Sequence, residues 1–117
     1  MVRRRLTQIV GTARARELYY TADRVSAQRA LELGLVNYVS PADELEEQTM
    51  ALAQRIAAGP PLALGYMKEN LNRALHSDVW TALDMEADRM WRTGMTTDHK
   101  EAVQAFVEKR PPTFHGR

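Results

Sequence analysis

The chain has 117 residues with 16 basic and 15 acidic side chains, so its charge is nearly balanced and indicates no strongly acidic partner. The absence of cysteine excludes a disulfide framework and thiolate zinc sites, and no apolar run approaches the roughly 20 residues that span a membrane. A length of 117 residues predicts one domain or part of one, and the start MVRRRLTQIV is predicted to be a poor signal peptide because it lacks a long apolar core.

The beginning of the chain is basic and is predicted to contain short helices. Arg3, Arg4 and Arg5 are consecutive, which is compatible with a phosphate or nucleic-acid contact. No aromatic residue lies among them to stack on a base, which favours a solvated helix end instead. Thr12 and Ser26 are predicted N-caps of the two helices that follow.

An extended connector is predicted after these helices. Gly34 can take the left-handed conformation that stops a helix. Residues 35–39, LVNYV, have strand propensity, but an isolated strand would present unpaired amides. We therefore expect an extended connector, or an edge that needs another chain segment.

Proline marks the boundaries of the next helices. Ser40-Pro41 predicts a helix start, and Gly59-Pro60 predicts the end of that helix. Acidic residues cluster in the first two turns of this helix, where negative charge suits the helix dipole. We interpret the cluster as a solvated face in preference to a metal site. The acidic residues are Asp43, Glu44, Glu46 and Glu47. Pro61 then opens a helix with an apolar stripe formed by Leu64, Met67, Leu71 and Leu75.

His76-Ser77-Asp78 is predicted to be a turn that ends in an N-cap. The helix after it carries large apolar side chains that are interpreted as core or interface, with an acyl pocket as the alternative: Trp80, Met85, Met90 and Trp91. Glu86 lies on much the same side of the helix as these apolar residues. Its carboxylate is expected either to pair with a cation across a helix or subunit contact or to lie at an exposed edge of the apolar stripe.

The last helix is predicted to begin at Asp98, which caps its N-terminus, with Glu101 completing a capping box. Lys109 and Arg110 fall in its last turn, where positive charge suits the exposed carbonyls. Pro111-Pro112 then hold the tail extended. Together the elements predict an all-α fold of about five to six helices with short turns.

No catalytic or metal-ligating residue is predicted. His76, His99 and His115 have no spacing that places two on one helix face. Asp98-His99 does not form a dyad on a helix, because adjacent residues point apart. The serines at helix starts are interpreted as caps, because no nucleophile motif surrounds them.

Phe106 and Lys109 are the candidate ligand-binding residues. Their spacing of three places an aromatic ring and an ammonium group on one helix face. An apolar plate beside a cation suits a ligand that carries an aromatic base and phosphates. The alternative is a buried phenylalanine covered by the stem of the lysine.

Three stretches carry a resemblance to a known family, the enoyl-CoA hydratase/isomerase enzymes of the crotonase superfamily. They are RLTQIVGTARARELYYTADRVSAQRALELGLVNYV, GPPLALGYMKENLNRA and AFVEKRPPTFHGR. The resemblance runs from about Arg5 to Arg117, and Arg5-Leu6 matches the R-L pair that follows the family's Gly-Gly-Thr turn. Ala22 and Ala102 depart from the pattern, because many relatives have glycine there.

The resemblance implies a C-terminal helical oligomerisation region at residues 40–117, preceded at residues 1–39 by the end of the crotonase core. The β-β-α spiral core, with its oxyanion hole and catalytic carboxylates, would lie outside this chain, so no catalytic residue is carried over. The implied ligand is an acyl-CoA of fatty-acid metabolism, held without covalent attachment, and the implied partner is either further copies in a trimer or dimer of trimers or a missing N-terminal half. The expected location is the cytoplasm, with which the absence of cysteine is compatible. Phe106 and Lys109 match the family's A-F-x-E-K-R pattern near the coenzyme A site.

Three functions follow as hypotheses. The first is a C-terminal segment of an enoyl-CoA hydratase/isomerase that supports oligomerisation and closure of the CoA site. Such a segment would have no hydratase activity of its own. Its residues do not distinguish a hydratase from an isomerase or a hydrolase. The second is a free-standing helical interaction module. The third is a basic nucleic-acid-binding helical domain using Arg3 to Arg5, Arg14 and Arg16; no nucleic-acid or membrane partner is expected under the first.

Overall fold

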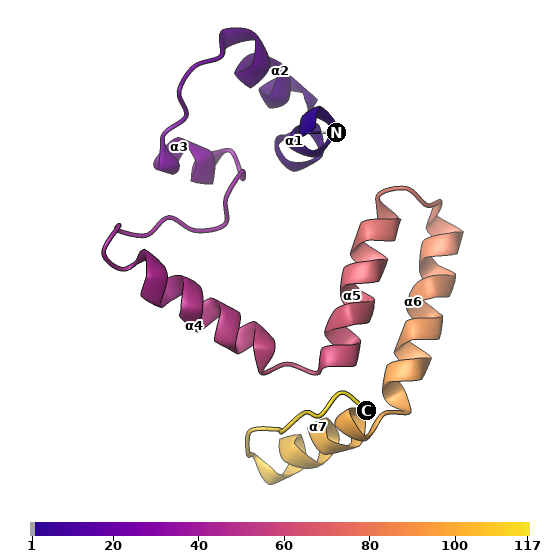
Figure 1. Ribbon diagram of the computed structural model, residues 1–117. Coiled ribbons are helices and arrows are strands. Elements are labelled where there is room, and N and C mark those ends of the chain that lie inside the picture. The colour runs from indigo at the N-terminus through magenta and orange to yellow at the C-terminus, as the bar shows by residue number, and fades with distance from the viewer. Residues whose placement is uncertain (1) are drawn as a thin grey trace. The chain divides into compact units, whose positions relative to one another are not determined.

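The computed structural model describes residues 2–117, with side chains from Arg4 onward, and every regular element in that range is a helix. The elements are α1 (Val2–Val10), α2 (Thr12–Thr21), α3 (Ala27–Glu32), α4 (Leu45–Ala57), α5 (Pro61–Ala74), α6 (Val79–Gly94) and α7 (Thr97–Glu108) (Figure 1). The predicted all-α class is confirmed, with seven helices in this range because the basic start forms a helix of its own. The chain divides into two compact units, Met1–Gln48 and Thr49–Arg117.

The first unit has a small apolar core between its helices. Val10, Ala15 and Leu33 are buried there, and Leu6, Leu18 and Leu35 pack against them. Gly11 separates α1 from α2 with a φ of 81°, a conformation that favours glycine. The predicted cap at Thr12 is therefore wrong, because Thr12 is already helical and Gly11 occupies the N-cap without a side-chain hydrogen bond.

Helix α3 begins and ends as predicted. The Ser26 hydroxyl oxygen accepts a hydrogen bond from the Arg29 N–H at 3.1 Å, which makes Ser26 the N-cap. Gly34 follows the helix with a φ of 72°, and the Leu35 N–H donates to the Ala30 carbonyl at 2.8 Å. This is the Schellman arrangement, which satisfies the last carbonyls of the helix.

The connector after α3 contains no strand in the part of the chain that the structure describes. The helix predicted to start at Ser40-Pro41 starts instead at Leu45. Pro41 opens a turn, in which its carbonyl accepts from the Glu44 N–H at 3.1 Å. The Ser40 hydroxyl donates to the Gln48 side chain, whose amide donates to the Glu44 carboxylate at 2.7 Å, so these polar groups form a small network before the first helical turn.

The second unit contains the α5–α6 hairpin and α7, which packs against α6. Pro61 starts α5 and Asp78 caps α6, both as predicted. The Asp78 carboxylate accepts from the N–H groups of Trp80 and Thr81, each at 3.0 Å. After α7 the chain reverses, and the extended tail runs back along the helix toward its N-terminus (Figure 1).

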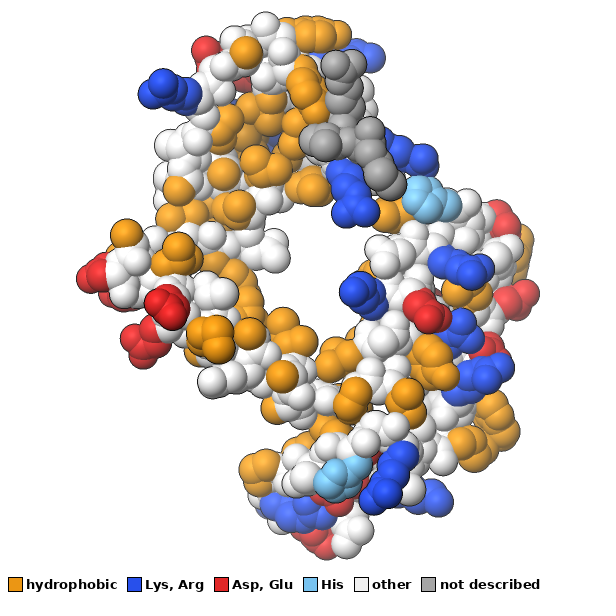
Figure 2. Space-filling view, in the orientation of Figure 1, with side chains coloured by type: hydrophobic (Ala, Val, Ile, Leu, Met, Phe, Trp, Pro, Cys, Tyr) orange, Lys and Arg blue, Asp and Glu red, His pale blue; other side chains and the backbone are white. Residues whose placement is uncertain are grey.

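Much of the apolar surface of the described residues faces solvent. Buried apolar residues are few: Val10, Ala15, Ala30, Leu33 and Ala105. By contrast, Leu71 is 72% exposed and Trp80 74%. Figure 2 shows apolar side chains spread over the face drawn. None of the helices among the described residues is both long enough and apolar enough to cross a membrane.

Candidate functional site

The start of α7 is capped by Thr96, whose hydroxyl oxygen accepts from the His99 N–H at 3.0 Å. The predicted cap at Asp98 and its capping box with Glu101 are therefore wrong. Asp98 lies within the first turn and is buried, with 4% of its surface exposed. A buried carboxylate requires hydrogen-bond partners, and those of Asp98 come from the C-terminal tail.

Asp98 ties the tail to the helix. Its two carboxylate oxygens accept from the N–H groups of His115 and Gly116, each at 2.8 Å. The Asp98 N–H in turn donates to the Arg117 carbonyl at 3.1 Å, and the Thr97 hydroxyl donates to the same carbonyl at 2.5 Å. The tail thus supplies backbone partners to the first turn of α7, where helical N–H groups lack intrahelical acceptors.

Glu101 makes the second attachment, one turn further along α7. Its carboxylate forms a bidentate pair with the Arg110 guanidinium, at 2.6 and 2.9 Å, and also accepts from the Thr113 N–H at 3.0 Å. Arg110, followed by the Thr113 N–H, lowers the pKa of Glu101 to about 2. Arg110 also donates to Glu108 at 2.6 Å, so its guanidinium is occupied by two carboxylates.

Phe106 and Lys109 lie where α7 ends, and both are exposed. Phe106 has 85% of its surface accessible, which contradicts the interpretation of an ordinary buried phenylalanine. Lys109 follows the last helical residue in a left-handed conformation, with a φ of 54°. The Lys109 N–H donates to the Phe106 carbonyl at 3.3 Å, which joins the two residues in one turn. No carboxylate among the side chains from Arg4 onward pairs with Lys109.

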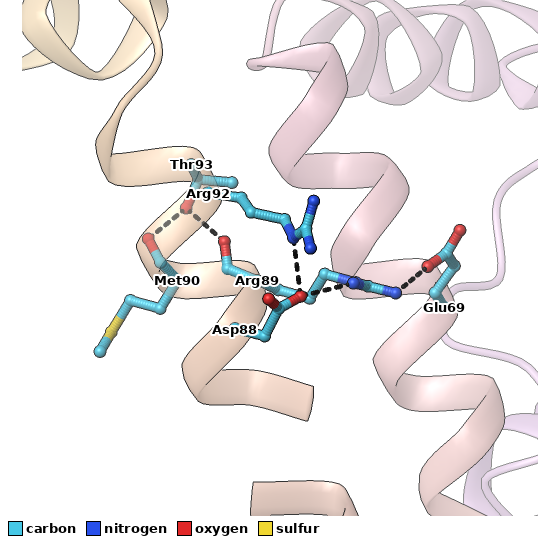
Figure 3. A network of polar contacts seen from close by, with 6 residues as sticks. All are labelled: Glu69, Asp88, Arg89, Met90, Arg92 and Thr93. Atoms are coloured by element: carbon cyan, nitrogen blue, oxygen red, sulfur yellow. Dashed lines mark hydrogen bonds and ion pairs between the residues drawn. The ribbon is translucent and has the colours of Figure 1, made fainter. Parts of the chain in front are cut away.

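A polar network lies on the α5–α6 hairpin (Figure 3). The Arg89 guanidinium donates to Glu69 on α5 at 3.0 Å and to Asp88 at 2.7 Å, and it stacks over the Tyr66 ring with 4.9 Å to the ring centre. Arg92 donates to the same Asp88 carboxylate at 2.8 Å. Arg92, followed by Arg89, lowers the pKa of Asp88. Arg89 therefore bridges the two helices through charge and through ring stacking.

Beside this network is an open groove of about 500 Å³ that is mostly apolar. Tyr66, Met67, Leu71 and Met90 contribute to its walls, with Arg89 at its polar side. Two buried polar atoms in these helices, the Asn70 side-chain oxygen and Arg89 Nε, have no hydrogen-bond partner among the described residues. Glu86 also lines the groove and forms no ion pair with the side chains described. It is exposed, which agrees with the alternative of an exposed edge of the stripe.

The remaining candidates from the sequence do not form a catalytic or metal-binding group. Within the described residues, no three histidine or acidic side chains are grouped as metal ligands would be. Asp98 uses both carboxylate oxygens on tail amides, which leaves no dyad with His99. Arg4 and Arg5 are exposed on α1, and the side chain of Arg3 lies outside the described residues.

Sequence reasoning missed that Arg110 and Lys109 have different roles. The local pattern explains both as cations near a helix end and gives Arg110 no carboxylate partner. The pairing of Glu101 with Arg110 needs the chain to reverse after the helix, and residues nine apart do not meet on a continuous helix. Thr96 was detectable as a cap, because threonine is favoured at that position.

Comparisons with known proteins agree on one family. A family model described as enoyl-CoA hydratase/isomerase matches residues 1–117. The short-chain-enoyl-CoA hydratase of Clostridium acetobutylicum is 37% identical over 106 residues, which cover 91% of this chain and 41% of that protein. The methylmalonyl-CoA decarboxylase of Escherichia coli is 34% identical over 113 residues, which cover 95% of this chain and 43% of that protein.

A solved structure gives the same result for the fold. The crystal structure of enoyl-CoA hydratase from Bacillus anthracis matches with a TM-score of 0.94 and 40% identity, over 98% of this chain and 45% of that one. The chain therefore spans less than half the length of these relatives. The resemblance seen in the sequence is confirmed, and the chain belongs to the enoyl-CoA hydratase/isomerase family.

Proposed function

We propose that the chain is the C-terminal helical part of an enzyme that acts on acyl-CoA thioesters in fatty-acid metabolism. In this proposal it contributes oligomerisation and closure of the CoA site, through the helical region at residues 40–117. The oxyanion hole and the acid–base groups would belong to the core of the family fold. The chain matches 41–45% of the length of these relatives, and the core would lie in the part that it does not match. Hydratase, isomerase and decarboxylase chemistry are therefore not separated by these residues.

The observation that carries the proposal is the exposed pair at the end of α7. A phenylalanine ring that is 85% accessible contributes little to the stability of its own helix. Beside it, Lys109 forms no ion pair with any side chain from Arg4 onward, while the adjacent Arg110 is held by carboxylates. A ring and an available ammonium group on one turn match the adenine ring and phosphates of coenzyme A, because the ring offers stacking and the cation offers charge.

The oligomerisation part of the proposal is supported by the exposed side chains of the α5–α6 hairpin. Leu71, Trp80, Met90 and Trp91 are all large and all at least 67% exposed. Leu71 and Met90 line the same apolar groove, and contiguous exposed apolar surface is typical of interaction sites. The same observation also favours the second candidate, a helical interaction module without catalysis.

The test of the CoA contact uses a hybrid hydratase. In it, this chain replaces the matched part of the Clostridium acetobutylicum short-chain-enoyl-CoA hydratase, and hydration of crotonyl-CoA is measured. Phe106→Ala and Lys109→Ala are expected to raise KM by about five- to fiftyfold, as loss of one stacking or charge-assisted contact predicts. Lys100→Ala, which removes an exposed cation from the same helix, is the control and should leave KM unchanged. Unchanged KM in both site variants would remove the CoA contact from the proposal.

Both candidate functions are tested with the 117-residue chain itself. By itself it is expected to hydrate no crotonyl-CoA, and a normal enzymatic rate would refute the proposed division of roles. Light scattering should show association through the exposed hairpin. A monomer that binds no apolar dye would argue against both oligomerisation and the interaction module.

A further inference from the structure

Lys109 adopts a backbone conformation that is costly for a residue with a side chain. Its φ of 54° lies in the left-handed region, where glycine usually ends a helix. The turn is closed by the Arg110 N–H, which donates to the Ala105 carbonyl at 3.0 Å, and by the Lys109 N–H on Phe106. A strained residue persists only where surrounding contacts hold it in place.

The contacts that hold this turn form a tail clasp, which we define as Asp98, Glu101, Arg110 and the tail Pro111–Arg117. Glu101 fixes Arg110, the residue directly after the strained turn, through two hydrogen bonds. It also fixes Thr113 in the tail, and Asp98 fixes the far end of the tail at His115 and Gly116. The chain after Lys109 is therefore attached to α7 at both ends.

The tail clasp determines which cation is available to a ligand. Arg110 is bound by Glu101 and Glu108, whereas Lys109 forms no ion pair with the described side chains. Without Glu101, Arg110 would keep only its contact with Glu108 at the end of the same helix, and the left-handed turn would lose its side-chain attachment to the preceding turns of α7. Phe106 and Lys109 would then sample several orientations, and ordering them would oppose ligand binding.

We infer that Asp98 and Glu101 are positioning residues, which act through the tail and Arg110 to hold Phe106 and Lys109 in the orientation that binds the CoA moiety. This inference rests on the proposed function. It assigns a role in substrate affinity to two carboxylates that touch no substrate.

The first test measures crotonyl-CoA kinetics in the hybrid hydratase. Glu101→Ala is expected to raise KM by about three- to tenfold with kcat unchanged, since the substitution frees the ordered turn without removing a contacting group. Glu108→Ala is the matched control, because Glu108 pairs with the same guanidinium but makes no bond to the tail. It should change KM by less than about twofold.

A mutant cycle separates positioning from general damage. If Glu101 acts through Phe106 and Lys109, adding Glu101→Ala to the double variant Phe106→Ala/Lys109→Ala should change KM by less than about twofold. A further rise of KM as large as the one that Glu101→Ala causes alone would overturn the positioning role. A raised KM for Phe106→Ala and Lys109→Ala with an unchanged KM for Glu101→Ala would overturn the inference and leave the proposed function standing.

The second test needs no hybrid. In the 117-residue chain, NMR amide exchange should show protection of the Thr113, His115 and Gly116 N–H groups. Asp98→Asn should lower protection at His115 and Gly116, and Glu101→Ala should lower it at Thr113, each by at least about tenfold. Unprotected tail amides in the unsubstituted chain would overturn the inference, whereas unchanged KM in the Phe106 and Lys109 variants would overturn the proposed function.

Discussion

The closing segment, residues 97–117, and the α5–α6 hairpin differ in how far their side chains find partners within the described chain. In the closing segment, Asp98 and Glu101 accept hydrogen bonds from the tail, and the polar groups of helix and tail pair with each other. In the hairpin, Leu71 and Trp80 face solvent, and Arg89 Nε has no partner among the described residues. The comparison indicates that the buried polar groups of the closing segment find their partners within the segment, whereas the hairpin leaves large apolar side chains exposed and a buried guanidinium nitrogen without a partner among the described residues.

The largest expected effect in this comparison comes from Asp98→Ala. The substitution leaves the His115 and Gly116 N–H groups without their acceptor, and we expect a loss of roughly 2–4 kcal/mol in the unfolding free energy of the 117-residue chain. Urea denaturation measures it. Asp84→Ala, which removes an exposed acid from α6, should change that free energy by less than about 0.5 kcal/mol. Equal effects of the two substitutions would show that Asp98 does not hold the tail.

Arg89→Ala should give the next largest effect, on the hairpin. It removes the ring contact with Tyr66 and the bridge to Glu69, and the expected loss is about 1–2 kcal/mol in the free energy of unfolding. Arg92→Ala is the control, because Arg92 is more exposed and pairs with Asp88 within its own helix. A larger loss for the Arg92 variant would contradict the assignment of Arg89 as the bridge between the helices.

The acid dependence of the tail clasp should be smaller, because the Glu101–Arg110 pair reaches solvent. Folding lowers the pKa of Glu101 from 4.5 to about 2, so the folded chain favours the ionised carboxylate. The stabilisation is fully present above about pH 4.5 and is lost as pH falls toward 2. NMR titration of the Glu101 carboxyl carbon measures it, and Glu101→Gln should remove this part of the pH dependence. A midpoint near 4.5 would exclude the clasp at Glu101.

Lys109→Gly should stabilise the chain slightly, since glycine adopts the left-handed conformation without strain. The expected gain is up to about 1 kcal/mol in the free energy of unfolding. Ala22, with a φ of 53°, should respond to glycine in the same direction. Lys100→Gly, within α7, should have the opposite sign, with a loss of about 0.5–1 kcal/mol. Destabilisation by Lys109→Gly would show that its side chain contributes to folding and not only to binding.

The smallest effect on the isolated chain is expected from Leu71→Glu. Because Leu71 is already exposed, its replacement should change the unfolding free energy by less than about 0.5 kcal/mol. In the hybrid hydratase the same change should impair assembly, which size-exclusion chromatography detects. Lys68→Glu adds an acid at an exposed polar position of the same helix and should leave assembly intact. Normal assembly of the Leu71 variant would remove the hairpin from the proposed interface.

The sequence predicted those parts of the fold that depend on neighbours in the chain. Ser26 and Asp78 were identified as caps, and Gly34 and Pro61 as the end and the start of helices, because their effects act within one helical turn. Asp98 was misassigned for the same reason. A local pattern of acid and glutamate fits a capping box, and only the returning tail shows that the carboxylate has other partners.

The sequence by itself determined the helical class and the family resemblance, because the order of residues along the chain encodes both. It also placed some helix boundaries, such as those at Ser26, Gly34 and Asp78, because these depend on a few consecutive positions. The tertiary structure decided which of two adjacent cations, Lys109 or Arg110, pairs with carboxylates, and which acids hold the tail. It also showed that Phe106 is exposed and not buried. Those outcomes depend on the reversal of the chain after α7, which brings Glu101 to Arg110 and Asp98 to His115 and Gly116 across many intervening residues.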